Sequence, residues 1–354
     1  MPPSTRIPHL LQPYLQLPLD DSLLLVTSTL GASANWLLIR FLCDALNPTN
    51  DLGGGDVSRN VVLVSWMREY EFWRQEARKG TGLDLEKLRR DARFSFVDGL
   101  SGTCLETASA TPTPSSRTLL STSHTKPLQT LPARGTSDRL VPARGPALPS
   151  ITPERVPATS VPATKATASK STSEHYTLSS LDLAHLTTTI SSAVSALASA
   201  APTSQRKTLL VLDNPDLLLA LNPAITPSSF ASVLLALHVV PTVSHIVTHI
   251  QADNPLLSLS TPPQPLELSH NNLLVKCAHM SRRILGVRVL DTGVARDVSG
   301  VVRVTEQRTG WHGLGFESEG REGEEESDKG REFLYRVKGD GSVKVFERGA
   351  GGEA

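Results

Sequence analysis

Short apolar runs alternate with helical repeats along the chain, which predicts an α/β protein. The apolar runs have the form of strands buried on both faces, and they lie at residues 23–27, 60–67, 94–98, 208–212 and 243–250. Helical spacing of apolar side chains marks residues 34–46, 70–79, 85–92, 178–199, 227–238 and 266–280. Helices between parallel strands predict a doubly wound, mostly parallel sheet. Later runs at 284–290 and 300–306, with a hairpin turning at 339–341, predict an antiparallel extension.

Composition divides this α/β domain into separated parts. Residues 107–175 are rich in Ser, Thr, Pro and Ala, a composition that predicts a long disordered insertion. Residues 1–106 and 176–316 then form the two parts of the domain, 317–330 an acidic linker, and 331–348 a C-terminal hairpin. We interpret the insertion as a tolerated surface loop. Its span from 107 to 173 holds eight Lys or Arg and two acids, so a tail that contacts RNA or is phosphorylated is the alternative.

Charge and cysteine content narrow the class of protein. Basic and acidic residues balance at 35 each, whereas a chain that binds nucleic acid by itself usually shows a basic excess. The three cysteines form no CxxC pair, which is typical of a reducing compartment. Pro8, Pro13 and Pro18 interrupt the apolar N-terminus, so we do not expect a signal peptide. These features predict a cytoplasmic or nuclear protein without a membrane span.

The loop after the first apolar run occupies the position of a phosphate-binding loop in NTPases. Such a loop needs glycines, a lysine for the β- and γ-phosphates, and Ser or Thr for magnesium. Ser28–Asn35 contains one glycine, Gly31, and the first lysine of the chain is Lys79. Arg40 lies more than a turn into the following helix, and we expect it to point elsewhere. We therefore predict no bound nucleotide, no other cofactor and no catalytic residue.

Two further motifs have both a structural and a functional interpretation. Asp213 follows an apolar strand, as in a Walker B segment, but residues 213–216 also have the form of a turn in which the Asp side chain bonds its own backbone. His245 and His249 share one strand face, with Cys277 and His279 later in the chain, but no set of ligands has zinc spacing. The structural interpretation is favoured for both motifs. No catalytic triad is apparent from the sequence.

The helix predicted at residues 70–79 has the composition of an interface. Trp73 lies beside the cations Arg74, Arg78 and Lys79, and aromatic residues and arginines are enriched at protein interfaces. We predict that these four residues contact a partner protein or tRNA. A helix that packs only on its own sheet is the simpler alternative.

Several segments together resemble the sixth subunit of the Elongator complex, above all its fungal forms. The matching segments are LLLVTSTLGASANWLLIRFL, VVLVSWMREYEFWRQEARKGTGLDLEKLRRDARFSFVDGL, TLLVLDNPDLLLALNPAI, VSHIVTHIQADNPLL and LVKCAHMSRRILGVRVLDTGVARDVSG. The resemblance covers most of the chain outside the insertion, and it is carried by the order and spacing of the segments. It implies a RecA-like fold without Walker motifs.

The same resemblance implies a role in assembly. The partners would be the fourth and fifth Elongator subunits in a hetero-hexameric ring, which binds tRNA and supports wobble-uridine modification by the catalytic subcomplex. In RecA-like rings the loops after the fourth and fifth strands face the channel. Here these loops, 214–227 and 251–265, contain no Lys or Arg, which favours a scaffold over an RNA reader. The alternatives are a P-loop-type ATPase or kinase with a degenerate loop, and a binding module whose basic insertion recruits nucleic acid.

Overall fold

One mixed sheet of ten strands organises the part of the chain that the structure describes. The structure is a computed structural model, and it describes residues 7–46, 58–102, 176–200, 206–258, 260–293, 295–306 and 330–348. The described residues all belong to one unit formed by 1–110 and 172–354. The predicted insertion at 107–175 and acidic residues 317–329 lie outside the described residues.

The strands follow the order β10-β9-β8-β7-β1-β6-β5-β2-β3-β4. From β7 to β4 all neighbours are parallel, and β7 to β10 pair antiparallel. This arrangement confirms the predicted α/β class with a mostly parallel sheet and an antiparallel C-terminal extension. The strand bounds are β1 Ser22–Ser28, β2 Asn60–Ser65, β3 Phe94–Asp98, β4 Tyr176–Thr177, β5 Thr208–Asp213, β6 Val243–Gln251, β7 Ser281–Arg288, β8 Gly300–Glu306, β9 Arg331–Val337 and β10 Val343–Glu347.

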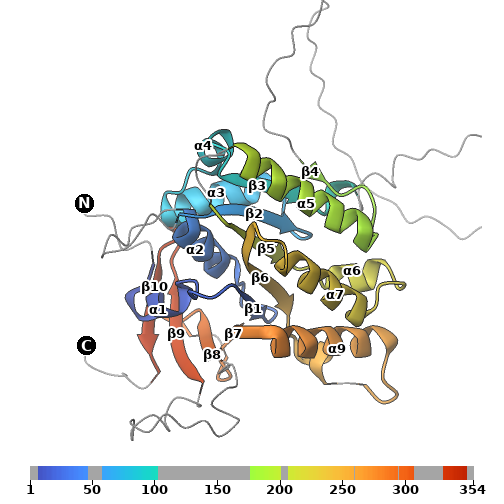
Figure 1. The fold of residues 1–354 in the computed structure, drawn as a ribbon. Helices are drawn as coiled ribbons and strands as arrows, with labels where there is room; N and C mark the ends of the chain where they lie inside the picture. The colour runs from blue at the N-terminus through green and yellow to red at the C-terminus, as the bar shows by residue number, and fades with distance from the viewer. Residues whose placement is uncertain are drawn as a thin grey trace, which may run out of the picture. The chain divides into compact units, whose positions relative to one another are not determined.

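Helices cover both faces of the parallel part of the sheet (Figure 1). One core contains α2, α3 and α4, and the other contains α5, α6, α7 and α9. Alternate residues of each strand enter opposite cores: Leu24 and Val26 of β1 pack in the first, Leu23 and Leu25 in the second. Because both faces are buried, the strands are continuous apolar runs. The helix bounds are η1 His9–Leu11, α1 Gln12–Leu15, α2 Asn35–Leu46, α3 Tyr70–Thr81, α4 Leu85–Arg90, α5 Leu183–Ala200, α6 Leu217–Leu221, α7 Pro227–His238, α8 Asn254–Leu257 and α9 Pro265–Met280.

The proline-rich N-terminal segment forms two short helical turns that belong to the first core. Leu11 of η1 and Leu15 of α1 are completely buried. Tyr14 packs its ring against Phe333 of β9, with centroids 5.8 Å apart, and Arg283 of β7 donates to the Tyr14 carbonyl at 2.7 Å. The segment thus packs against the antiparallel extension. Its helical turns are too short to give a repeat that the sequence could display.

Arg40 joins helix α2 to the C-terminal hairpin. Its Nη2 donates to the carbonyl oxygens of Gly341 at 3.0 Å and Gly80 at 3.4 Å, and its Nη1 donates to Trp36 O at 3.1 Å. As predicted, Arg40 points away from the loop after β1. Burial lowers the pKa of Arg40 to about 10. The guanidinium stays charged at neutral pH, so the carbonyl groups of α3 and the β9–β10 turn must solvate it.

Gly80 lies inside α3, although the helix predicted here covers only residues 70–79. A Cβ on Gly80 would lie 3.2 Å from Arg40 Nη1 and 3.3 Å from Gly341 O. The glycine is therefore needed for close approach of the hairpin turn. Helix α3 instead ends at Gly82, which adopts the left-handed conformation with φ 68°.

Asp44 of α2 gives the fold a specific dependence on pH. Burial raises the pKa of Asp44 from 3.8 to about 6, against the opposing charge of Arg59. The folded state therefore binds an extra proton between these values, so its stability falls as pH rises from about 4 to about 6. We expect Asp44→Asn to raise the free energy of unfolding by about 1–3 kcal/mol at pH 7.

At pH 4 the same substitution is expected to have little effect, because Asp44 is then protonated in the folded state. Urea denaturation of both chains at a series of pH values measures the difference. Parallel stability curves for the wild type and Asp44→Asn across this interval would contradict the assignment.

Candidate functional site at the carboxyl edge of the sheet

The strand register brings four polar side chains together at the carboxyl edge of the sheet. Ser65, the last residue of β2, pairs with Asp213, the last residue of β5, and Asp213 pairs with His249 of β6. Ser28 ends β1 on the other side of β6, where it pairs with Gln251. The side chains point toward α2 and α3, because they continue the alternation of the strand residues that enter that core.

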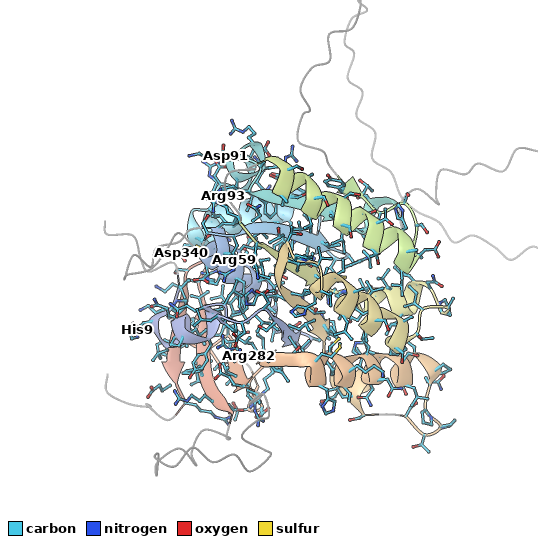
Figure 2. All side chains as sticks on the ribbon, viewed as in Figure 1. His9, Arg59, Asp91, Arg93, Arg282 and Asp340 are labelled. Atoms are coloured by element: carbon cyan, nitrogen blue, oxygen red, sulfur yellow. The ribbon has the colours of Figure 1, made fainter. Side chains whose placement is uncertain are left out.

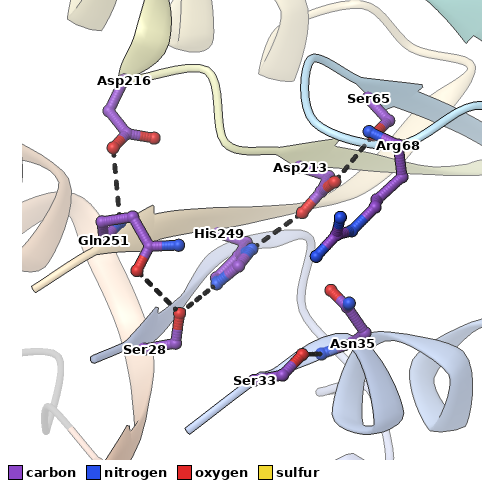
Figure 3. A network of polar contacts seen from close by, with 9 residues as sticks. All are labelled: Ser28, Ser33, Asn35, Ser65, Arg68, Asp213, Asp216, His249 and Gln251. Carbon is purple, nitrogen blue, oxygen red and sulfur yellow. Dashed lines mark hydrogen bonds and ion pairs between the residues drawn. The ribbon is translucent and has the colours of Figure 1, made fainter. Parts of the chain in front are cut away.

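These side chains form one hydrogen-bonded chain, which we call the edge network (Figure 3). Ser28 Oγ lies 2.8 Å from His249 Nε2, and His249 Nδ1 lies 2.8 Å from Asp213 Oδ1. Ser65 Oγ donates to Asp213 Oδ2 at 2.7 Å and accepts from the Arg68 amide at 3.0 Å. Because a carboxylate can only accept, Nδ1 of His249 carries a hydrogen. Each carboxylate oxygen of Asp213 therefore accepts a hydrogen bond within the edge network.

Ser28, His249 and Asp213 have the order of a nucleophile, a base and an orienting acid. Sequence reasoning found no triad, because each member comes from a different strand and only the register brings them together. In this structure Ser28 is 2% exposed, and its single hydroxyl hydrogen is donated to Gln251 Oε1 at 3.1 Å, so it is not available to His249 at the same time. Asp213 is completely buried. Both side chains are therefore shielded from solvent in this structure.

The backbone of the loop after β1 is hydrogen-bonded to strand β7, to the carboxylate of Asp253 before α8, and to itself. The Leu30 amide donates to a carboxylate oxygen of Asp253, the Thr29 amide donates to Val287 O at 3.1 Å, and the Ala32 amide donates to Thr29 O at 2.9 Å. In a phosphate-binding loop such amides point at the anion. Here a carboxylate of the chain itself takes one of these amides. The loop also contains no lysine or arginine that could neutralise a triphosphate.

Residues 213–216 form the predicted turn, but the Asp213 side chain does not make it. Asn214 adopts a positive φ of 57°, and the Leu217 amide donates to Asn214 O at 3.3 Å. The carboxylate of Asp213 instead belongs to the edge network. The expectation that this side chain bonds its own backbone was wrong. The carboxylate accepts hydrogen bonds from Ser65 and His249 instead, and the sequence does not show that these two residues of neighbouring strands lie beside it.

The histidines and cysteine considered as metal ligands lie in different places. Nε2 of His245 is 3.1 Å from Pro18 O, and burial lowers the pKa of His245 to about 4. Cys277 of α9 lies in the core on the opposite face. Within the described ranges, no group of three or more His, Cys, Asp or Glu side chains could hold a metal ion.

The four residues of α3 that were predicted at an interface differ in burial: one is buried and three are exposed. Trp73 is completely buried in the core of its own domain, and its ring makes an edge contact with Phe72 at 5.5 Å. The prediction that Trp73 contacts a partner or tRNA was therefore wrong. An aromatic residue followed by charged residues occurs both at interfaces and in amphipathic helices that dock on a sheet, so the local sequence does not distinguish the two.

The three cations of α3 remain available on the surface. Arg74, Arg78 and Lys79 are exposed, although Arg74 pairs with Glu71 at 2.6 Å and Lys79 lies 3.7 Å from Glu76. The structure contains no partner chain that could contact them, so their role at an interface stays a prediction.

Neither protein-family models nor the curated proteins give a match to this chain. In the part of the chain with described structure, no helix is both long and apolar enough to span a membrane.

Proposed function

We propose that this protein is a non-catalytic, RecA-like subunit of the Elongator hetero-hexameric ring. Its partners are the fourth and fifth Elongator subunits, and through the assembled ring it supports tRNA binding and wobble-uridine modification in the cytoplasm or nucleus. The proposal takes its ring and its partners from the resemblance of the sequence segments. The physical properties of the carboxyl edge support its non-catalytic part.

The observation that carries the non-catalytic assignment is the internal satisfaction of the edge network. In a P-loop enzyme the aspartate after the apolar strand and the amides of the loop are free for magnesium and phosphate. Here His249 and Ser65 occupy both oxygens of Asp213, and Asp253 takes the Leu30 amide. Nucleotide binding would require both sets of contacts to break. A P-loop-type ATPase or kinase is therefore the weaker alternative.

Assembly with the proposed partners is tested by co-expression with the fourth and fifth Elongator subunits, followed by native mass spectrometry. The expected result is a complex that contains all three chains in equal numbers. If the two other subunits assemble while this chain stays free, the proposed function is wrong.

The exposed cations of α3 give a second test of the same proposal. We expect the double substitution Arg78→Glu and Lys79→Glu to weaken ring assembly at least about tenfold, because reversed charges oppose a complementary surface. Both side chains are exposed, so the free energy of unfolding of the isolated chain should stay within about 0.5 kcal/mol.

The matched control reverses Lys207, which precedes β5, and Arg282 of β7, which Figure 2 labels; their side chains are 50% and 39% exposed. Native mass spectrometry and analytical ultracentrifugation measure assembly of both variants. Unchanged assembly and unchanged tRNA affinity of the α3 variant would show that this helix has no interface role.

A further inference from the structure

A basic pocket opens beside the loop after β1. It has a volume of about 670 Å³, and it is lined by that loop, the β7–β8 connection and the end of β9 with its turn. We define the basic pocket by Gly31, Val289, Arg296, Ser299, Arg336 and Lys338. None of these residues belongs to the edge network.

Local backbone geometry builds the wall of the basic pocket. Gly31 has a φ of 86°, which L side chains rarely adopt, and a Cβ on it would lie 3.2 Å from Val289 Cγ1. Ser299 Oγ accepts from the Val337 amide at 3.0 Å and so joins the start of β8 to the end of β9. The pocket wall is therefore fixed by the sheet and by one glycine turn.

The basic pocket carries positive charge that its own walls do not neutralise. Among the described residues that line it, three are cationic and none has a carboxylate. Arg336 Nη1 donates to Asp297 just outside the pocket at 2.8 Å. Within the described part of the chain, Arg296 makes no ion pair. Lys338 makes no direct ion pair there but interacts electrostatically with Asp340 of the adjoining turn, and both cations are exposed. A concave surface with cations of this kind attracts anionic groups.

Apolar side chains complete the surface. Val289 and Val337 line the basic pocket with 43% and 38% of their surface exposed, and Leu30, which precedes Gly31, is 87% exposed. Exposed aliphatic groups gathered beside cations are typical of a protein interaction site. No aromatic ring is found among the described lining residues, so the surface offers nothing on which a nucleobase could stack.

We propose that the basic pocket docks an acidic peptide segment of a partner protein. Carboxylates of the segment pair with Arg296 and Lys338, and aliphatic side chains between them pack on Val289 and Val337. An open basin suits such a segment better than a small metabolite, whose sites usually enclose most of the ligand surface. The proposal does not depend on the Elongator ring, since it rests only on the chemistry of this surface.

Fluorescence anisotropy of a labelled peptide with a repeated Glu-Glu-Leu sequence tests the docking on the full-length chain. The double substitution Arg296→Glu and Lys338→Glu is expected to weaken binding at least about tenfold, because like charges then face each other. The control that reverses Lys207 and Arg282 makes the same change of net charge elsewhere and should bind as the wild type does. Val289→Ser is expected to weaken binding of this peptide but not of a Glu-Glu-Gly repeat. Circular dichroism shows that each variant is folded.

Three results would overturn the proposal. One is equal peptide binding by the pocket variant and the control. A second is displacement of the peptide by pyrophosphate or by single-stranded RNA at lower concentration than by unlabelled peptide, which would assign the pocket to phosphate groups. A third is tighter peptide binding when the acids of residues 317–328 are replaced by their amides, which would identify that segment of the chain itself as the occupant.

Discussion

Replacing Trp73 with alanine is expected to lower the free energy of unfolding by about 3–5 kcal/mol. The indole is completely buried between α3 and the sheet. In the described part of the chain its Nε1 has no hydrogen-bond partner, so the loss comes from packing and from the cavity that alanine leaves. Urea denaturation monitored by circular dichroism measures the change on the isolated chain.

Arg74→Ala is the matched control for this prediction, since the neighbouring side chain is exposed and should change stability by less than about 0.5 kcal/mol. If Trp73→Ala leaves the isolated chain as stable as Arg74→Ala does and instead weakens assembly, the indole is an interface residue and its buried placement is incorrect.

Asp213→Ala is expected to destabilise the protein by about 3–5 kcal/mol, because it removes one partner of a buried pair. His249 and Ser65 would lose their acceptor in a region where neither is reached by water. Asp213→Asn keeps the size and one acceptor oxygen, so we expect a smaller loss of about 1–3 kcal/mol. Thermal and urea unfolding of the three chains measure this order.

The same variants distinguish a structural aspartate from a catalytic one. A structural role predicts that stability falls in the order wild type, Asp213→Asn, Asp213→Ala, without any ATP turnover to lose. Steady ATP hydrolysis by the wild type that Asp213→Asn abolishes without a change in stability would instead identify a working Walker B residue.

Local chemistry made some elements predictable to the residue. Thr226 and Pro227 are a cap and a first-turn proline, and α7 begins at Pro227 with the Ser229 amide donating to Thr226 Oγ1 at 3.1 Å. Asp84 caps α4 in the same way through the Lys87 amide. Both signals lie within four residues of chain, so no distant contact was needed to interpret them.

Features that depend on distant contacts were missed. The helix predicted over residues 70–79 stops before Gly80, because the sequence does not show that Gly341 packs against this glycine. Trp73 was assigned to an interface, because burial of one helix face depends on how that helix docks. Each of these errors follows from a contact between residues far apart in the chain.

The edge network was only partly visible in the sequence. Asp213 was noticed, but its link through His249 to Ser28 requires β6 to lie between β5 and β1. One signal could have pointed to the group: Ser28 and Asp213 each follow an apolar run directly, and Ser65 lies near the carboxyl end of another. Polar side chains at this shared position of parallel strands are candidates for a common site.

The position of β1 in the sheet also bears on the order in which the protein can fold during its synthesis. This strand is synthesised well before its two neighbours, β6 and β7, whose pairing with β1 begins at His245 and Ser281. Pairing of such high sequence separation is slow. The apolar β1 therefore waits with both edges open while most of the chain is made, and this nascent strand is where we expect a chaperone to bind first.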